Sequence, residues 1–314
     1  MLLHLAVADA YGFSFEYAVS DFVHAHNDVR GYRQHPTWPD IKPGVYSDDS
    51  QMSIAVALAL LSDQPPTALS LANLFVNVFR RDPRKGYSGR FYDLLLKMKG
   101  GPDFLRLVQP QSSKSGGAMR AVPCGILPTI EEAVDFALHQ ASLTHATKDG
   151  MGAAGATAAL AWACRHGCDR GFLPQFLNDV VPGYNWGTPW TGPVGAPGLH
   201  SVKAALAAVV AHDNLHDILR AAVAFTGDVD TVAAIAIGSA SLHPNIESNL
   251  SQTLYDGLEP GGKFGVKYLI DLDAALFKKY SLVATASVKN EALAEPEAYS
   301  ILDMLGPGRD SNDT

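Results

Sequence analysis

Two short acidic clusters, far apart in the chain, carry the residue types best suited to chemistry. The first is Ser47-Asp48-Asp49, just before the apolar run 52–61, and the second is Asp228-Val229-Asp230-Thr231, just before the apolar run 232–237. Each cluster combines two carboxylates with a hydroxyl, and such oxygen ligands are the ones that Mg²⁺ and Mn²⁺ prefer. Adjacent carboxylates repel one another when buried, and a divalent cation relieves that repulsion. The two clusters therefore predict two halves of one metal site.

Helix capping is the alternative interpretation of each cluster. Ser and Asp are favoured at helix N-caps, and acidic residues in the first turn complement the helix dipole. However, the apolar runs that follow draw both clusters toward the interior, where carboxylates need a counter-charge. Neither cluster contains a lysine or an arginine, so a metal ion is the simpler explanation of the pair.

Composition limits the class of protein. The chain has 314 residues, 47% of them hydrophobic, and a formal net charge of -8, which fits a globular protein with a large core and disfavours nucleic acid as a partner. Three cysteines cannot form an even disulfide framework, and the first residues lack the charged start of a signal peptide. Since no apolar run approaches the roughly 20 residues of a membrane-spanning helix, we expect a cytoplasmic protein without a membrane partner.

Helical spacing of apolar residues dominates the chain, and alternating strand patterns are hard to find. We therefore predict an all-α fold in a single domain over residues 1–305, followed by a polar tail over residues 306–314 that frays. The predicted helices cover residues 2–10, 51–62, 68–80, 89–98, 116–122, 130–143, 150–168, 172–179, 202–211, 215–225, 229–242, 246–254, 264–279 and 291–304.

Irregular segments between these helices are candidates for recognition, because loops on a rigid scaffold often carry it. Residues 21–44 contain His24, His26, His35 and Trp38 and indicate a lid or rim. Residues 111–120 form a Gly/Ser-rich loop that opens a helix, where backbone amides favour an anionic phosphate.

A third irregular segment, residues 183–200, holds three aromatic side chains among several glycines and prolines: Tyr184, Trp186 and Trp190. Such aromatics either form a stacking wall for a base or seal the loop onto the body of the protein. Since few directed polar groups accompany them, we favour the second interpretation.

Five motifs occur in an order that resembles a known family. They are Asp9-Ala-Tyr-Gly12 with Glu16; Tyr46-Ser-Asp-Asp-Ser-Gln-Met52; Ser115-Gly-Gly-Ala-Met-Arg120 with Pro123 and Gly125; Thr144-His145; and Gly227-Asp-Val-Asp-Thr231 with Ala233 and Ala234. Together they resemble the ADP-ribosylglycohydrolase family, in particular its dinitrogen-reductase-activating and ADP-ribosylarginine hydrolase members. The resemblance extends from Asp9 to about Gly265, with Val229 standing where the family usually has threonine.

The resemblance implies an orthogonal helix bundle with two Mg²⁺ or Mn²⁺ ions in a central cleft. The metal ligands that it implies are Ser47, Asp48, Asp49, Asp228, Asp230 and Thr231. Glu16 matches a mobile glutamate of the family, and Glu16, Asp48 and Asp228 are the candidates for the catalytic proton transfers. The residues implied for ADP-ribose binding are Ser115, Gly116, Gly117, Ala118, Met119, Arg120 and His145.

The activity that the resemblance implies is hydrolysis of the glycosidic bond between ADP-ribose and an acceptor. Two cations can hold ribose hydroxyls, lower the pKa of a bridging water and stabilise charge as the bond opens, and a carboxylate can orient that water. We favour an ADP-ribosylated protein as substrate, with arginine ahead of serine as acceptor. Another ADP-ribosylated metabolite or nucleic acid, a non-catalytic ADP-ribose-binding or immunity protein, and a binuclear phosphoesterase are the alternatives.

Overall fold

The computed structural model describes residues 1–281, and within them it contains helices and isolated β-bridges but no strand. The all-α prediction is confirmed. No helix among these residues is both long and apolar enough to cross a membrane. The predicted helix 291–304 and the predicted tail 306–314 lie outside the described residues, so the extent of the domain to residue 305 stays a prediction.

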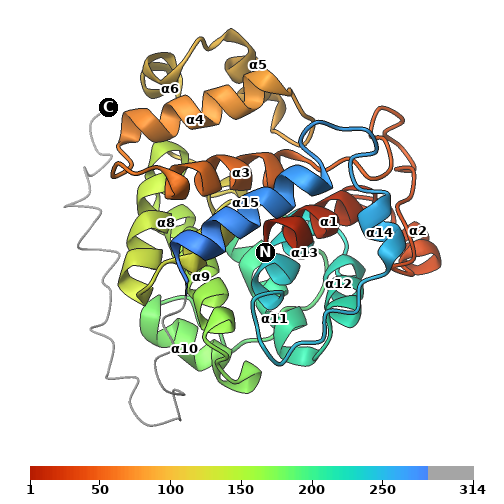
Figure 1. Ribbon diagram of the computed structural model, residues 1–314. Coiled ribbons are helices and arrows are strands. Elements are labelled where there is room, and N and C mark those ends of the chain that lie inside the picture. Colours follow the sequence, from red (N-terminus) through yellow and green to blue (C-terminus); the bar gives the residue numbers. More distant parts are fainter. Residues whose placement is uncertain (282–314) are drawn as a thin grey trace, which may run out of the picture.

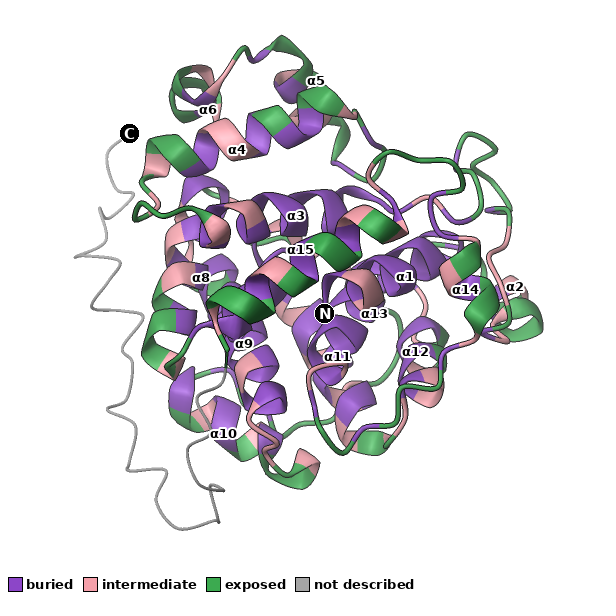
Figure 2. Ribbon diagram, viewed as in Figure 1, coloured by how far each residue is buried: buried purple, intermediate pink, exposed green. Residues whose placement is uncertain are grey.

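Two helices form the centre of the molecule. Helix α1 (Leu2–Phe13) packs against helix α13 (Val229–Ala240), although the two are far apart in the chain (Figure 1). Every residue of α13 is buried, and α1 is buried except at Leu3 and His4 (Figure 2). Helices that are apolar on all sides belong in a core, and these two have that composition.

Three further helices surround the central pair: α3 (Asp48–Leu61), α9 (Lys148–Arg165) and α11 (Gly198–Ala211). Helix α9 consists mainly of Ala and Gly, and small side chains let helices approach closely. For example, a Cβ added at Gly125, in the 3-10 helix η1 (Val122–Ile126), would lie 2.5 Å from the Cβ of Ala161 in α9.

Amphipathic helices cover the outside, with their exposed faces toward solvent (Figure 2). The longer ones are α4 (Ala68–Arg81), α8 (Ile130–His145), α12 (Leu215–Ala224) and α15 (Val266–Lys279). The shorter elements are α2 (Ser20–His26), α5 (Gly89–Lys97), α6 (Gly101–Leu107), α7 (Gly116–Met119), η2 (Arg170–Phe172), α10 (Leu173–Val180) and α14 (Gln252–Asp256).

The structure differs from the predicted helices most clearly at α2, α6 and α14. Helices α2 and α6 are absent from the prediction, and both are only 7 residues long. Gly100, Gly101 and Pro102 are typical of a loop, so the sequence did not indicate the start of α6. Proline is nevertheless tolerated in a first helical turn, because its missing N–H needs no partner there. The predicted helix 246–254 is wrong in its first part: the N–H of Glu247 donates to Asp213, and α14 begins only at Gln252.

Candidate active site

Helix α1 fixes the positions of both acidic clusters. The buried carboxylate of Asp9 accepts hydrogen bonds from the backbone N–H groups of Ser47 (3.0 Å) and Ser50 (2.9 Å), at the start of α3. Three positions later, on the same face of α1, Gly12 lies against the start of α13: a Cβ at Gly12 would be 2.5 Å from the Cα of Asp230. One helix therefore holds the N-terminal ends of two others.

Asp9 is a functional residue that sequence reasoning missed, although it opens the first motif. Burial raises the pKa of Asp9 to about 6, and the hydrogen bonds from Ser50 and Ser47 oppose that rise. The hydrogen bonds that it accepts hold the start of α3 in place. The available signal was a single carboxylate in the middle of an otherwise apolar helix, where an acid needs a specific partner.

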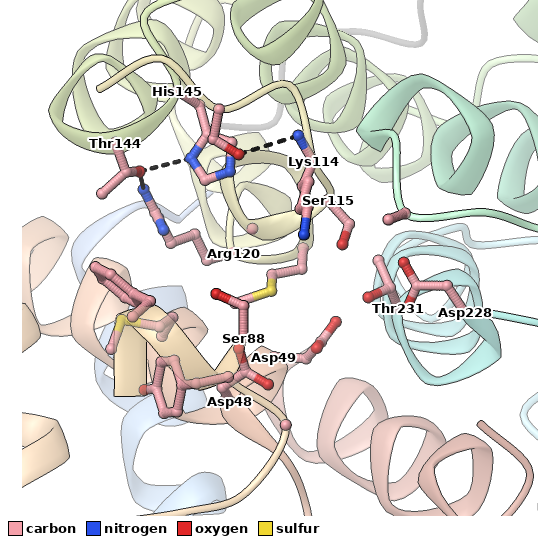
Figure 3. Close-up of a pocket in the computed structure, with 18 of the residues that line it drawn as sticks. Asp48, Asp49, Ser88, Lys114, Ser115, Arg120, Thr144, His145, Asp228 and Thr231 are labelled. Atoms are coloured by element: carbon pink, nitrogen blue, oxygen red, sulfur yellow. Dashed lines mark hydrogen bonds between the residues drawn. The ribbon is translucent and has the colours of Figure 1, made fainter. Parts of the chain in front are cut away.

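The carboxylates of the two clusters and Glu16 line one cavity of about 320 Å³ (Figure 3). Oxygen atoms of Glu16, Asp228 and Asp230 lie within 4.8 Å of one another, and Asp48 and Asp49 contribute the α3 side of the same cavity. The four aspartates are buried and Glu16 is half-buried. Asp48 and Asp228, which are far apart in the chain, thus belong to one acidic surface, as the prediction of two half-sites requires.

Burial raises the pKa of every carboxylate on this surface. For Glu16, Asp48, Asp49 and Asp230 the pKa lies well above its usual value, first because of burial and then because other carboxylates are close. Burial also raises the pKa of Asp228, although the polar groups of neighbouring residues oppose the rise. Within residues 1–281 none of the five forms an ion pair with a lysine or arginine.

Two buried carboxylate oxygens show that the site suits a cation. The Oδ1 atoms of Asp49 and Asp230 have no hydrogen-bond partner among the described residues. A buried acceptor without a partner is costly, and an ionised one more so. Divalent cations such as Mg²⁺ and Mn²⁺ take carboxylate and hydroxyl oxygens as ligands, so the residues of this site fit the predicted binuclear centre.

Ser47 differs from the other predicted ligands. Its hydroxyl caps α3 by accepting from the N–H of Asp49 (3.1 Å), and it donates to Oδ2 of Asp49 (3.3 Å). It is not among the residues that line the cavity. The capping interpretation therefore describes the observed contacts of Ser47, whereas Asp228, at the N-cap of α13, makes no capping hydrogen bond with its side chain. The role of Ser47 as a metal ligand stays a prediction.

The glycine loop forms the wall of the cavity opposite the acidic surface. Ser115, Gly116, Met119 and Arg120 line the cavity, and Gly117 and Ala118 are buried behind it. A Cβ at Gly116 would lie 2.9 Å from Cε1 of His145, and one at Gly117 would lie 3.2 Å from its Cβ. The two glycines therefore give His145 the space to face the cavity.

A hydrogen-bonded chain sets the chemistry of His145 (Figure 3). The guanidinium of Arg120 donates to Oγ1 of Thr144 (2.7 Å), which lies 2.6 Å from Nδ1 of His145. Nδ1 of His145 is therefore engaged with Thr144, and Nε2 is the ring nitrogen that lies on the side of Gly116. Burial, followed by the charge of Arg120, lowers the pKa of His145 to about 3. Burial thus favours the neutral imidazole, whose Nε2 lies beside Gly116.

Backbone groups in two places, whose contacts sequence reasoning missed, complete the walls. In the loop between α4 and α5, Gly86 has a left-handed φ of 105°, and a Cβ there would lie 2.0 Å from Oδ1 of Asp48. At the other end, Val194 accepts from the N–H of Asp228 (3.0 Å), and Ala196 accepts from the N–H of Ser115 (3.0 Å). Because backbone atoms make these contacts, the residue types did not predict them, apart from the glycine at position 86.

The aromatic segment 183–200 seals onto the body of the protein. Trp186 is buried and donates from Nε1 to the carbonyl of Val181 (2.7 Å), and Tyr184 is buried with its hydroxyl bonded to the carbonyl of Lys148 (2.7 Å). The plug interpretation is confirmed for these two side chains. Trp190 is half-buried and packs on His200, with ring centroids 4.7 Å apart.

The predicted lid, residues 21–44, is partly the helix α2, which carries His24 and His26 on the exposed surface. His35 is buried, and its Nε2 lies 2.8 Å from the carbonyl oxygen of Glu16. This segment therefore contacts the backbone of Glu16, although none of its residues lines the cavity.

Comparison with solved structures first defines the class of fold. The structure resembles an "ADP-ribosylglycohydrolase-related protein complex" with a TM-score of 0.64 and 19% sequence identity, covering 88% of this chain and 95% of that chain. At this identity the likeness establishes the fold, an α-helical ADP-ribosylglycohydrolase fold. The sequence model of the ADP-ribosylglycohydrolase family matches residues 1–240, which include every predicted site residue. The chain belongs to the ADP-ribosylglycohydrolase family.

A curated relative is similar over a shorter region. ADP-ribosylhydrolase ARH3 of Xenopus tropicalis is 26% identical over 118 residues, which is 35% of this chain and 33% of that protein. The match therefore spans about a third of the relative's length. The resemblance drawn from the five sequence motifs is confirmed at the level of the family.

Proposed function

We propose that this protein hydrolyses the glycosidic bond between ADP-ribose and an acceptor, releasing ADP-ribose, with two divalent cations as cofactors. One observation carries the proposal: carboxylates from α3 and α13, with Glu16, face the glycine loop and His145 across a single cavity. Membership in a glycohydrolase family supports the reaction class. The orphaned oxygens of Asp49 and Asp230 support the use of cations.

The residues of α3 and α13 would hold the two Mg²⁺ or Mn²⁺ ions. The proposed ligands are Ser47, Asp48, Asp49, Asp228, Asp230 and Thr231. When bound, such ions act as Lewis acids that orient hydroxyl groups and make water more acidic. The protein's part is to keep the carboxylates in place, which Asp9 and Gly12 do through the ends of the two helices.

Glu16 is the proposed residue for moving the proton of the attacking water. It follows α1 directly, lies next to Asp228 and Asp230, and borders the cavity. Its pKa is raised by burial and then by Asp228, Asp48 and Asp9, and a base with a raised pKa takes up a proton more readily. Asp48 and Asp228 are the other carboxylates placed to orient the water.

The opposite wall is proposed to bind the ADP-ribose part of the substrate. Ser115, Gly116, Met119 and His145 border the space directly, and Nε2 of His145 is the ring nitrogen that would form a hydrogen bond with the substrate. Arg120 holds Thr144 and His145 in place, and Gly117 and Ala118 support the loop from behind. Lys114, which also borders the cavity, adds a positive charge for the pyrophosphate.

For the acceptor, we place arginine in an ADP-ribosylated protein ahead of serine, because the five sequence motifs resemble those of ADP-ribosylarginine hydrolases. The test is the release of free ADP-ribose from an ADP-ribosylarginine peptide and an ADP-ribosylserine peptide, each with Mg²⁺, with Mn²⁺ and with chelator. We expect release that requires a divalent cation. Tight binding of ADP-ribose without release from either peptide, or release of inorganic phosphate instead, would contradict the proposed function.

A further inference from the structure

A second cavity, of about 330 Å³, adjoins the first at Glu16, Gly86 and Tyr87. Its other walls come from Phe13, Lys85 and residues 38–41, none of which lines the first cavity. Residues 38–41 belong to the long loop between α2 and α3, on the right in Figure 1. Both cavities fall in the range of about 300–1,000 Å³ that is typical of small-ligand sites.

The arrangement of the two cavities matches the two parts of the proposed substrate. The first cavity reaches from the acidic surface to the glycine loop and His145, so it has the polar groups suited to ADP-ribose. The acceptor is bonded to the reacting carbon and must occupy a space that borders the acidic surface but not the glycine loop. The second cavity borders Glu16 and contains no residue of 111–120.

The chemistry of the second cavity favours a planar cation. Trp38 is 39% exposed, and one face of its indole stacks on His35 at 4.2 Å between centroids and 10° between planes. The acidic residues Glu16 and Asp40 line the same space together with one basic residue, Lys85, whose ammonium lies 6.0 Å from the centroid of the Tyr92 ring. An aromatic surface beside carboxylates suits guanidinium, which stacks on aromatic rings and binds carboxylates with its planar N–H groups.

His35 ties this wall to the site of chemistry. Its Nδ1 accepts from the N–H of Thr37 (3.2 Å) and of Trp38 (3.0 Å), so its hydrogen is on Nε2, which donates to the carbonyl of Glu16 (2.8 Å). The amide of Gln34 donates to the carbonyls of Trp38 (3.2 Å) and Ile41 (2.8 Å). The indole and the Glu16 backbone are thus fixed by one network, and the wall is organised before a ligand binds.

We propose that the second cavity binds the arginine side chain of the acceptor, with Trp38 stacking on the guanidinium and Asp40 pairing with it. This assignment rests on the proposed function, because it needs a substrate whose ADP-ribose part occupies the first cavity. Under this assignment Trp38 and Asp40 determine acceptor specificity, and residues 35–41, the loop that carries both, take part in recognition.

The test compares Trp38→Ala and Asp40→Asn with the unmodified protein. Three quantities are measured with Mg²⁺: kcat/KM for the ADP-ribosylarginine peptide, kcat/KM for the ADP-ribosylserine peptide, and the Kd of free ADP-ribose. We expect each variant to lower kcat/KM for the arginine peptide by about tenfold, the value of one cation–π or charged contact. Release from the serine peptide and the Kd of ADP-ribose should stay within about twofold.

Two control variants match the changes. Trp190→Ala removes another loop tryptophan that packs on a histidine but lines neither cavity, and Asp63→Asn removes an exposed carboxylate after α3. Both should leave all three quantities unchanged. Thermal unfolding shows whether Trp38→Ala is folded. If Trp38→Ala is not folded, Asp40→Asn, at an exposed position, tests the proposal independently.

The outcomes separate this inference from the proposed function. Release from the serine peptide alone, or equal losses on both peptides, would overturn the arginine site while leaving the hydrolase proposal in place. A weaker Kd for ADP-ribose in both variants would place the second cavity on the nucleotide side and overturn the assignment. Absence of release from either peptide by the unmodified protein would remove the proposed function and this inference together.

Discussion

The missing side chain at Gly116 decides where His145 can lie. His145 contacts both glycines of the loop, and its ring is neutral because burial and Arg120 lower its pKa to about 3. A neutral ring offers the cavity a hydrogen-bonding group and not a charge. The glycines of this loop thus serve the placement of an imidazole as much as the close approach of a phosphate.

At the residue scale, Gly116→Ala should weaken binding of ADP-ribose. The new Cβ would lie 2.9 Å from Cε1 of His145, and relieving such an overlap typically costs about 1–3 kcal/mol. We expect the Kd of ADP-ribose, measured by calorimetry, to rise about tenfold. The control is Gly89→Ala, also at the first position of a helix but with nothing within 4 Å of the new Cβ. Equal affinities in both variants would show that His145 does not depend on this space.

Helix α1 explains why the first motif has its spacing. Asp9 and Gly12 lie three residues apart on one helix face, so one can hold α3 while the other contacts α13, and Glu16 follows in the next turn. The motif therefore encodes the alignment of two helix ends. Its contribution to chemistry is indirect except at Glu16, which borders the cavity.

At the element scale, Gly12→Ala should destabilise the protein. In an exposed helix this change stabilises by about 1 kcal/mol, but here the Cβ would lie 2.5 Å from the Cα of Asp230 and 2.8 Å from the carbonyl oxygen of Val229. Backbone atoms cannot rotate away, so we expect a net loss of about 1–3 kcal/mol in the free energy of unfolding, measured with urea. Gly31→Ala, which meets nothing within 4 Å, should change stability little. A Gly12→Ala variant that is more stable than the unmodified protein would refute the close packing of α1 against the start of α13.

Sequence periodicity recovers the long helices because their apolar residues repeat at the helical period, whatever their partners. It fails for α2 and α6, which are short and carry few buried residues. The acidic clusters and the glycine loop could be predicted because carboxylates and glycines have distinctive chemistry, whereas Glu16 and His145 were predicted from the family resemblance. The contributions of Val194, Ala196 and Gly86 could not be predicted from the sequence, because they depend on backbone groups that the fold brings together. The contact between His35 and Glu16 depends on the tertiary fold in the same way.

At the scale of the whole molecule, the acidic site opposes folding unless cations are bound. Carboxylates whose pKa is raised in the folded state stabilise it below their unfolded pKa of about 4, and this stabilisation is lost as pH rises through the folded pKa. This pH dependence applies to Asp9, whose pKa is about 6. It also applies to the carboxylates of the acidic surface, whose pKa values lie well above the ordinary range. The proposed cations would bind the ionised form and so would reverse the effect.

The corresponding prediction concerns the gain in Tm on adding Mn²⁺ to chelated protein. We expect the gain to be small near pH 5 and to grow steadily to pH 8, where saturation at 100 times the Kd stabilises by about 2.7 kcal/mol per site. Differential scanning calorimetry at matched pH values measures it, and histidine titration cancels because both samples share each pH. A gain that is constant or falls with pH would contradict a carboxylate metal site.

The most direct measurement of the central claim is Mn²⁺ binding by calorimetry to the unmodified protein and to Asp230→Asn, combined with ADP-ribose release from the arginine peptide. We predict two bound ions in the unmodified protein. In Asp230→Asn, which loses a buried carboxylate with a free Oδ1, tight binding should be lost and release should fall about a hundredfold. Asp63→Asn should match the unmodified protein. A protein that binds no Mn²⁺, or an Asp230→Asn variant that keeps both binding and release, would contradict the account.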